Sequence, residues 1–122
     1  MHEMAIAQSL LEIIEGEMAS WPSSRLKEIK LRIGVLSGVV PEALEFAFQV
    51  ASQGTVAEGA LLRIERVPFR VRCKSCKGTF EEDLPFMVCP RCGGEVEVLS
   101  GRELEIESME IEDGGQGRKE DP

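Results

Sequence analysis

Two Cys-x-x-Cys pairs carry the clearest chemical signal in this sequence of 122 residues. Cys73 and Cys76 form the first pair, and Cys89 and Cys92 form the second. A turn with two residues between its cysteines brings both thiolates to one ion, and two such turns complete a tetrahedral all-sulfur shell. Soft thiolate ligands select zinc over magnesium or calcium. The spacing therefore predicts a zinc ribbon, with rubredoxin-like iron or a redox dithiol as the alternatives.

A complete shell of four sulfurs leaves no coordination position open, so this zinc is expected to be structural rather than catalytic. Gly78 follows the first pair and Gly93-Gly94 follows the second, where glycine permits tight turns. The stretch 79–88 between the pairs is long enough for a β-hairpin. In a reducing compartment, cysteines in this pattern are typical of metal ligands rather than of disulfides.

The first three residues, Met1, His2 and Glu3, form a second candidate metal site, and His2 is the only histidine of the chain. The terminal amine, the His2 amide nitrogen and the His2 imidazole Nδ1 can chelate one ion through fused five- and six-membered rings. Planar nitrogen sites of this kind select Ni(II) or Cu(II). One position then stays open for the Glu3 carboxylate or for a side chain of a partner. A second geometry uses the amide nitrogens of His2 and Glu3 with Nδ1 and leaves out the amine.

Hydrophobic periodicity predicts two helices. In residues 4–19 the apolar side chains recur at helical spacing, so an amphipathic helix is expected to begin almost at the first residue. A second helix is expected to start at Pro41, because proline suits the first helical position, and to end before Gly54.

Alternation of apolar and polar residues predicts three long strands, over residues 28–36, 60–67 and 102–112. The segment between the second and the third holds all four cysteines and few large core residues. The predicted fold is therefore α+β, a small three-stranded sheet with two helices, plus an inserted four-cysteine zinc-ribbon domain. The predicted parts are a discontinuous nickel-binding α+β domain at 1–68 and 101–113, the zinc-ribbon insert at 69–100 and a disordered tail at 114–122.

The charge balance disfavours a nucleic-acid partner. The chain has 22 acidic and 14 basic residues and a formal net charge of −8, which repels a phosphate backbone on average, although basic residues crowd between Arg63 and Lys77. No apolar run approaches the roughly 20 residues of a membrane span, so we expect a cytoplasmic protein without a membrane partner. No phosphate-binding glycine loop, nucleophile elbow or paired acid–base motif is visible, so we expect no enzymatic activity.

The sequence resembles the HypA/HybF family of hydrogenase nickel-incorporation proteins over nearly its full length apart from the tail. The resemblance implies that Met1, His2 and Glu3 bind nickel and that the four cysteines bind zinc. The segments that carry it are MHEMAIAQSLLEII, IGVLSGVVPEALEFAF, EGALLRIERVP, the C-K-S-C and C-P-R-C pairs, and the final ELEIESMEIE.

The same resemblance implies a nickel metallochaperone that delivers Ni(II) for maturation of [NiFe] hydrogenase, and in some bacteria of urease. It implies a nickel-handling GTPase of the HypB type and the [NiFe] hydrogenase large subunit precursor as partners. Certain family members carry histidines near the zinc cysteines, and this chain has none, which puts any nickel ligand or pH response there in doubt. The alternative function is a zinc-ribbon interaction module that binds nucleic acid or a transcription complex.

Overall fold

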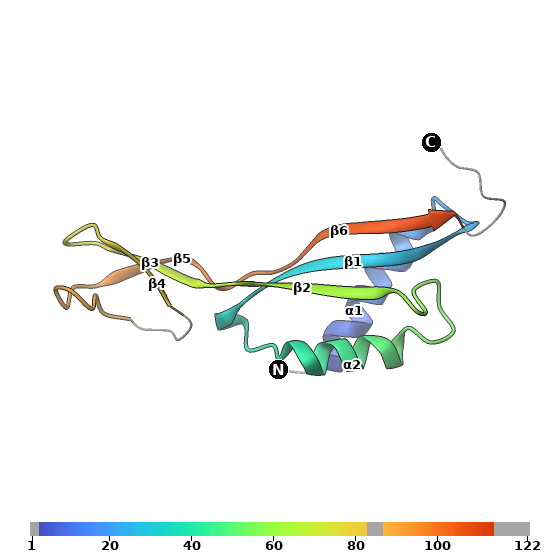
Figure 1. Ribbon diagram of the computed structural model, residues 1–122, viewed down its shortest axis with the longest axis horizontal. Helices are drawn as coiled ribbons and strands as arrows, with labels where there is room; N and C mark the ends of the chain where they lie inside the picture. Colours follow the sequence, from blue (N-terminus) through green and yellow to red (C-terminus); the bar gives the residue numbers. More distant parts are fainter. Residues whose placement is uncertain (1–2, 83–86, 114–122) are drawn as a thin grey trace. The chain divides into compact units, whose positions relative to one another are not determined.

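The computed structural model describes residues 3–82 and 87–113, and Figure 1 shows the order of their helices and strands. Met1 and His2, predicted as nickel ligands, and residues 114–122, predicted as a disordered tail, lie outside the described residues. The described chain forms two compact units. One holds residues 3–31, 39–63 and 106–113, and the other holds residues 32–38 and 64–105 with the gap at 83–86.

The first unit contains α1 (Glu3–Met18) and α2 (Pro41–Ala51), which pack against each other. As predicted, proline stands at the start of α2, where its missing N–H costs no helical hydrogen bond. The buried side chains recur at helical spacing, as an amphipathic helix requires. They are Ala7, Leu10, Leu11, Ile14 and Met18 in α1, and Leu44, Ala47 and Phe48 in α2. Both predicted helices are confirmed.

The first sheet has the order β2-β1-β6. Lys27 pairs with Glu110 at 3.5 Å and Lys30 pairs with Glu107 at 3.6 Å, so β1 and β6 run in opposite directions. Buried apolar residues such as Leu31 alternate with these lysines along β1, which leaves one face of the strand to the core and the other to charged residues. The strands are β1 (Ser24–Gly34), β2 (Leu61–Val67) and β6 (Leu104–Asp113).

The second unit contains the cysteine segment and a second three-stranded sheet in the order β4-β3-β5. Both neighbours of β3 are antiparallel to it, and Val71 lies opposite Phe80 on one side and Val98 on the other. β4 thus pairs with β3 across the first cysteine turn, whereas the sequence predicted a hairpin within 79–88. The predicted α+β fold with its four-cysteine segment is confirmed. The strands are β3 (Phe69–Cys73), β4 (Thr79–Glu82) and β5 (Val96–Ser100).

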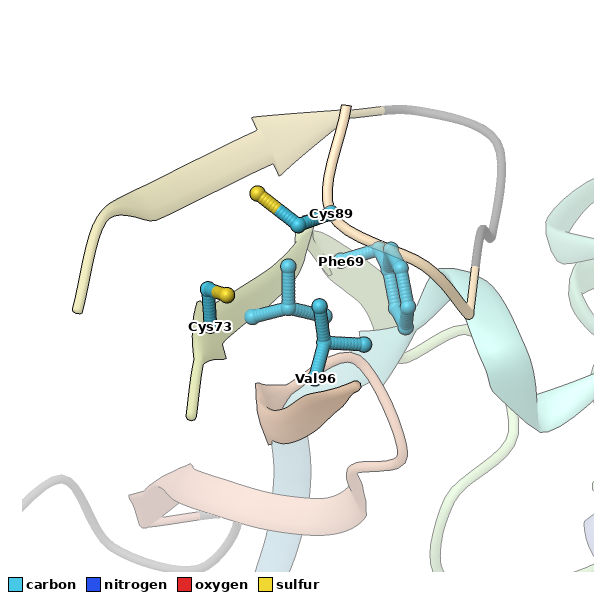
Figure 2. Packing of buried hydrophobic residues seen from close by; sticks show 5 residues of the cluster. Phe69, Cys73, Cys89 and Val96 are labelled. Atoms are coloured by element: carbon cyan, nitrogen blue, oxygen red, sulfur yellow. The ribbon is translucent and has the colours of Figure 1, made fainter. Parts of the chain in front are cut away.

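The core of the second unit is small, and it includes two of the cysteines. Its buried members are Phe69, Val71, Cys73, Cys89 and Val96, and Figure 2 shows the two sulfur atoms beside the apolar side chains. Two residues of the short 3₁₀ turn η1 (Val35–Ser37) pack against this core from the end of β1. The strand predicted over residues 28–36 therefore ends earlier, because its last two side chains turn into the core of the second unit.

The backbone at the end of β1 lies very close to the backbone of the segment just before β6. The Gly34 amide donates to the Glu103 carbonyl at 2.8 Å, and the Leu36 amide donates to the Gly101 carbonyl at 2.7 Å. A Cβ at Gly34 would overlap the carbonyl group of Gly101, and Gly101 itself has a φ of 121°, which favours glycine. Both glycines are thus required by the backbone itself.

We predict that Gly34→Ala destabilises the protein by at least about 3 kcal/mol, because the added methyl group meets backbone that cannot rotate away. Gly16→Ala is the matched control, since a Cβ there meets nothing within 4 Å and alanine favours a helix interior by about 1 kcal/mol. Denaturant unfolding of the metal-loaded protein measures both. An unchanged midpoint for Gly34→Ala would contradict the close approach.

Candidate metal centre

Two turns of the same construction present the four cysteines. In the first, the Cys73 amide donates to the Gly78 carbonyl at 2.9 Å and the Lys77 amide donates to the Cys73 carbonyl at 3.0 Å. Lys77 has a φ of 64°, the left-handed conformation that closes such a turn. The second turn repeats both backbone bonds at Cys89, Gly93 and Gly94, each at 2.8 Å. A glycine thus stands in the second turn where the first has Lys77.

The four sulfur atoms converge on one point. All lie within 4.8 Å of one another, with Cys73 Sγ 3.5 Å from Cys92 Sγ and Cys76 Sγ 3.8 Å from Cys89 Sγ. A tetrahedral ion bound at about 2.3 Å by four sulfurs separates them by about 3.8 Å, so these distances suit such an ion. The spacing of the two Cys-x-x-Cys pairs predicted that the four cysteines share one ion. In the structure they form one group that could hold a metal ion.

Backbone amides stabilise negative charge on Cys73. The amides of Cys76 and Ser75 donate to its Sγ at 3.4 and 3.3 Å. The Cys76 amide is the larger cause, and together they outweigh burial and lower the pKa of the Cys73 thiol to about 6. Cys73 is therefore a thiolate at neutral pH, which is the form that binds metal.

The second turn shifts the pKa values of its two cysteines in opposite directions. Burial opposes ionisation of Cys89, yet the amides of Cys92 and Arg91, which donate to its Sγ at 3.4 and 3.3 Å, outweigh burial and lower its pKa. The Gly94 amide favours the Cys92 thiolate, but the neighbouring Cys73 sulfur, burial and the other thiols raise the pKa of Cys92 to about 11. Without a cation, four crowded thiols cannot all ionise.

The basic run that crowds the sequence near the cysteines does not form an unbroken cationic surface. Three of its basic side chains form ion pairs of 3.4–3.7 Å with carboxylates on an opposite strand or turn. The pairs are Arg70 with Glu81, Arg72 with Glu97, and Lys74 with Glu95. This arrangement does not favour the alternative of a nucleic-acid-binding ribbon, which needs basic side chains that are available to phosphates.

Of the predicted nickel residues, the structure describes Glu3, the first residue of α1. Its carboxylate Oε2 accepts a hydrogen bond from the Val40 amide at 3.0 Å. Val40 is the N-cap of α2 and has no side chain that can cap the helix, so a carboxylate from elsewhere suits this positive helix end. The sequence analysis did not predict this contact, because Glu3 and Val40 lie far apart in the chain.

No helix among residues 3–82 and 87–113 is long and apolar enough to cross a membrane.

Comparison with known proteins gives concordant matches. The family model described as "Hydrogenase/urease nickel incorporation, metallochaperone, hypA" matches residues 1–111. The "Hydrogenase maturation factor HypA" of Solidesulfovibrio magneticus is 48% identical over 117 residues, covering 92% of this chain and 100% of its own. That of Geobacter sulfurreducens is 46% identical over 113 residues, with coverage of 92% and 100%.

Two solved structures have the same fold. The solution structure of the Ni metallochaperone HypA from Helicobacter pylori matches with a TM-score of 0.62 at 24% identity, covering 91% of this chain and 97% of that one. A second solution structure of a HypA protein matches with a TM-score of 0.66 at 24% identity, covering 90% and 95%.

We predict that metal uptake by the cysteine group releases fewer protons at about pH 7.5 than the number of thiols it uses, because Cys73 with its pKa of about 6 is already ionised. Cys92, whose pKa is about 11, still has to lose its proton on binding. At about pH 5 Cys73 is also protonated, so the release rises and the affinity falls more steeply with acid. Calorimetric titration of metal-free protein with Zn(II), in buffers of different ionisation enthalpy, counts these protons. An equal release at both pH values would contradict the lowered pKa of Cys73.

Proposed function

Because the chain belongs to the HypA family of hydrogenase and urease nickel-incorporation metallochaperones, we propose that it binds Ni(II) at its N-terminus and delivers it for maturation of a [NiFe] hydrogenase. Membership in a metallochaperone family confirms the prediction that the chain is not an enzyme. The proposed partners are a nickel-handling GTPase of the HypB type and the [NiFe] hydrogenase large subunit precursor. The proposed location of the protein and of these interactions is the cytoplasm.

The observation that carries this proposal is the convergence of all four cysteines on one point. A four-sulfur shell is closed, so an ion held there has no position at which a recipient's ligand can attack. We therefore assign structural Zn(II) to Cys73, Cys76, Cys89 and Cys92. A nickel ion that must be handed on needs a different site with few ligands, and the chain has a single imidazole, that of His2.

For the nickel site we propose the Met1 amine, the His2 amide and the His2 Nδ1 as three in-plane donors. The Glu3 carboxylate supports the site from its contact with Val40, where it ties the start of α1 to the start of α2. This leaves the fourth in-plane position for a ligand of the recipient protein. An ion held by three donors with one position open can be transferred through a four-ligand intermediate without first being released to water.

His2→Ala should abolish the planar Ni(II) absorption spectrum while zinc content and the unfolding midpoint stay unchanged, because the imidazole is the one side-chain nitrogen donor of the proposed site. Acetylating the Met1 amine, or adding residues before it, should weaken nickel binding or change its spectrum, since the amine becomes an amide and the set of nitrogen donors changes. The measurement is titration of the untagged, zinc-loaded protein with Ni(II), followed by d–d absorption. Undiminished nickel binding by His2→Ala would place the cargo site elsewhere.

Glu3→Gln separates the two roles open to Glu3. If the side chain acts by accepting the Val40 amide, the glutamine oxygen can replace it, and we expect a nickel affinity within about threefold of the original. Glu3→Ala removes the acceptor and should lower both the affinity and the unfolding free energy, the latter by about 1 kcal/mol. Titration with Ni(II) and denaturant unfolding measure the two effects. A glutamine variant that binds as poorly as the alanine variant would make the carboxylate a nickel ligand.

A further inference from the structure

The solvent side of α2 carries an apolar stripe. Phe46 is 67% exposed, more than any other large apolar side chain in the described part of the chain, and Val50 is 43% exposed. They lie four residues apart and therefore on the same face of the helix, with exposed Ala43 beside them. Leu44 and Phe48 occupy the opposite, buried face, so the stripe does not contribute to the core. We call Ala43, Phe46 and Val50 the α2 stripe.

Carboxylates border the α2 stripe on one side. Glu42 and Glu45 are exposed, and by helical geometry Glu42 precedes Phe46 by one turn. Within residues 3–82 and 87–113 neither of them forms an ion pair. The sequence has no lysine or arginine over residues 1–24 or 33–62, which include both helices. The helices therefore have no basic side chain of their own that could neutralise Glu42 and Glu45.

Isolated exposed apolar residues are common on protein surfaces. Apolar side chains aligned on the outer face of a helix form a contiguous patch, and such patches often mark interaction sites. Aromatic anchors flanked by charge are typical of faces that a partner covers. A phenylalanine that points away from the core gains nothing for the isolated fold, whereas the same ring placed under a partner's apolar side chains gains the full hydrophobic contribution.

We propose that the α2 stripe docks an amphipathic helical segment of a partner protein, with lysine or arginine beside its apolar residues. The cations would meet Glu42 and Glu45 while the apolar residues cover Phe46 and Val50. A second copy of this chain suits the surface less, because two copies with a net charge of −8 each would bring these carboxylates together. The chain's own residues 114–122 contain no large apolar side chain that could cover a phenylalanine.

The test uses the full-length, zinc-loaded protein and a synthetic helical peptide with leucines on one face and lysines beside them. Titration followed by amide NMR should shift the signals of α2, with an affinity that falls as salt rises. Phe46→Ser should weaken binding about tenfold or more. Leu99→Ser is the matched control, because Leu99 is 37% exposed and belongs to the other compact unit, and it should leave binding unchanged. Replacing both Glu42 and Glu45 by glutamine should weaken binding and flatten its salt dependence.

Three controls make the result decisive. A peptide of the same composition in scrambled order should bind at least about tenfold more weakly, and equal binding would reduce the interaction to charge alone and overturn the proposal. Sedimentation should show a monomer at all concentrations, whereas self-association that Phe46→Ser abolishes would assign the stripe to a second copy. Signal shifts that map outside α2 would also overturn it. Nickel binding of Phe46→Ser should be unchanged, so the docking surface and the nickel site can fail independently.

Discussion

The convergence of four thiols is the constraint on which the whole second unit depends. Two of its five buried core residues are Cys73 and Cys89, and the other three are Phe69, Val71 and Val96. Such a core buries too little apolar surface to fold a segment of this length without help. A sulfur-bound ion supplies roughly 10–16 kcal/mol of apparent free energy, which is enough to compensate. In the proposed zinc form the metal is therefore part of the core rather than an accessory to it.

The same constraint distinguishes the proposed structural zinc from the proposed nickel cargo. Amides that donate to Cys73 and Cys89 make them good ligands before any ion arrives, and burial of both sulfurs slows exchange with solvent. A site built in this way retains its ion. A site that gives its ion away must have few donors, and the proposed nickel site before α1 has a single imidazole in its sequence. The carboxylate of Glu3 accepts the Val40 amide and so connects the start of α1 to the start of α2.

Local patterns predicted much of this structure, because they depend on residues close together in the chain. Cysteine spacing predicted the sulfur group, and apolar periodicity predicted both helices and the three long strands. Contacts between distant residues were not visible, since nothing in the neighbourhood of Gly34 points to Gly101. The hydrogen bond from Val40 to Glu3 was missed for the same reason. The pairing of β4 with β3 is local, and it was missed because the length of the stretch 79–88 suggested a hairpin within that stretch. The nickel residues came from a resemblance joined to coordination chemistry, and they stay a prediction.

Electrostatics explains why a basic run in the sequence is not a basic surface in the structure. Residues of alternating charge on neighbouring strands meet in pairs, as Arg72 meets Glu97 and Lys30 meets Glu107. Each exposed pair contributes little stability, but together they cancel the positive potential of the strands. The helices have no cations to cancel their carboxylates, so the excess negative charge of the chain collects there. α1 begins at Glu3, directly after the proposed nickel ligands in the sequence, and a negative potential of this kind attracts dications and repels anionic polymers.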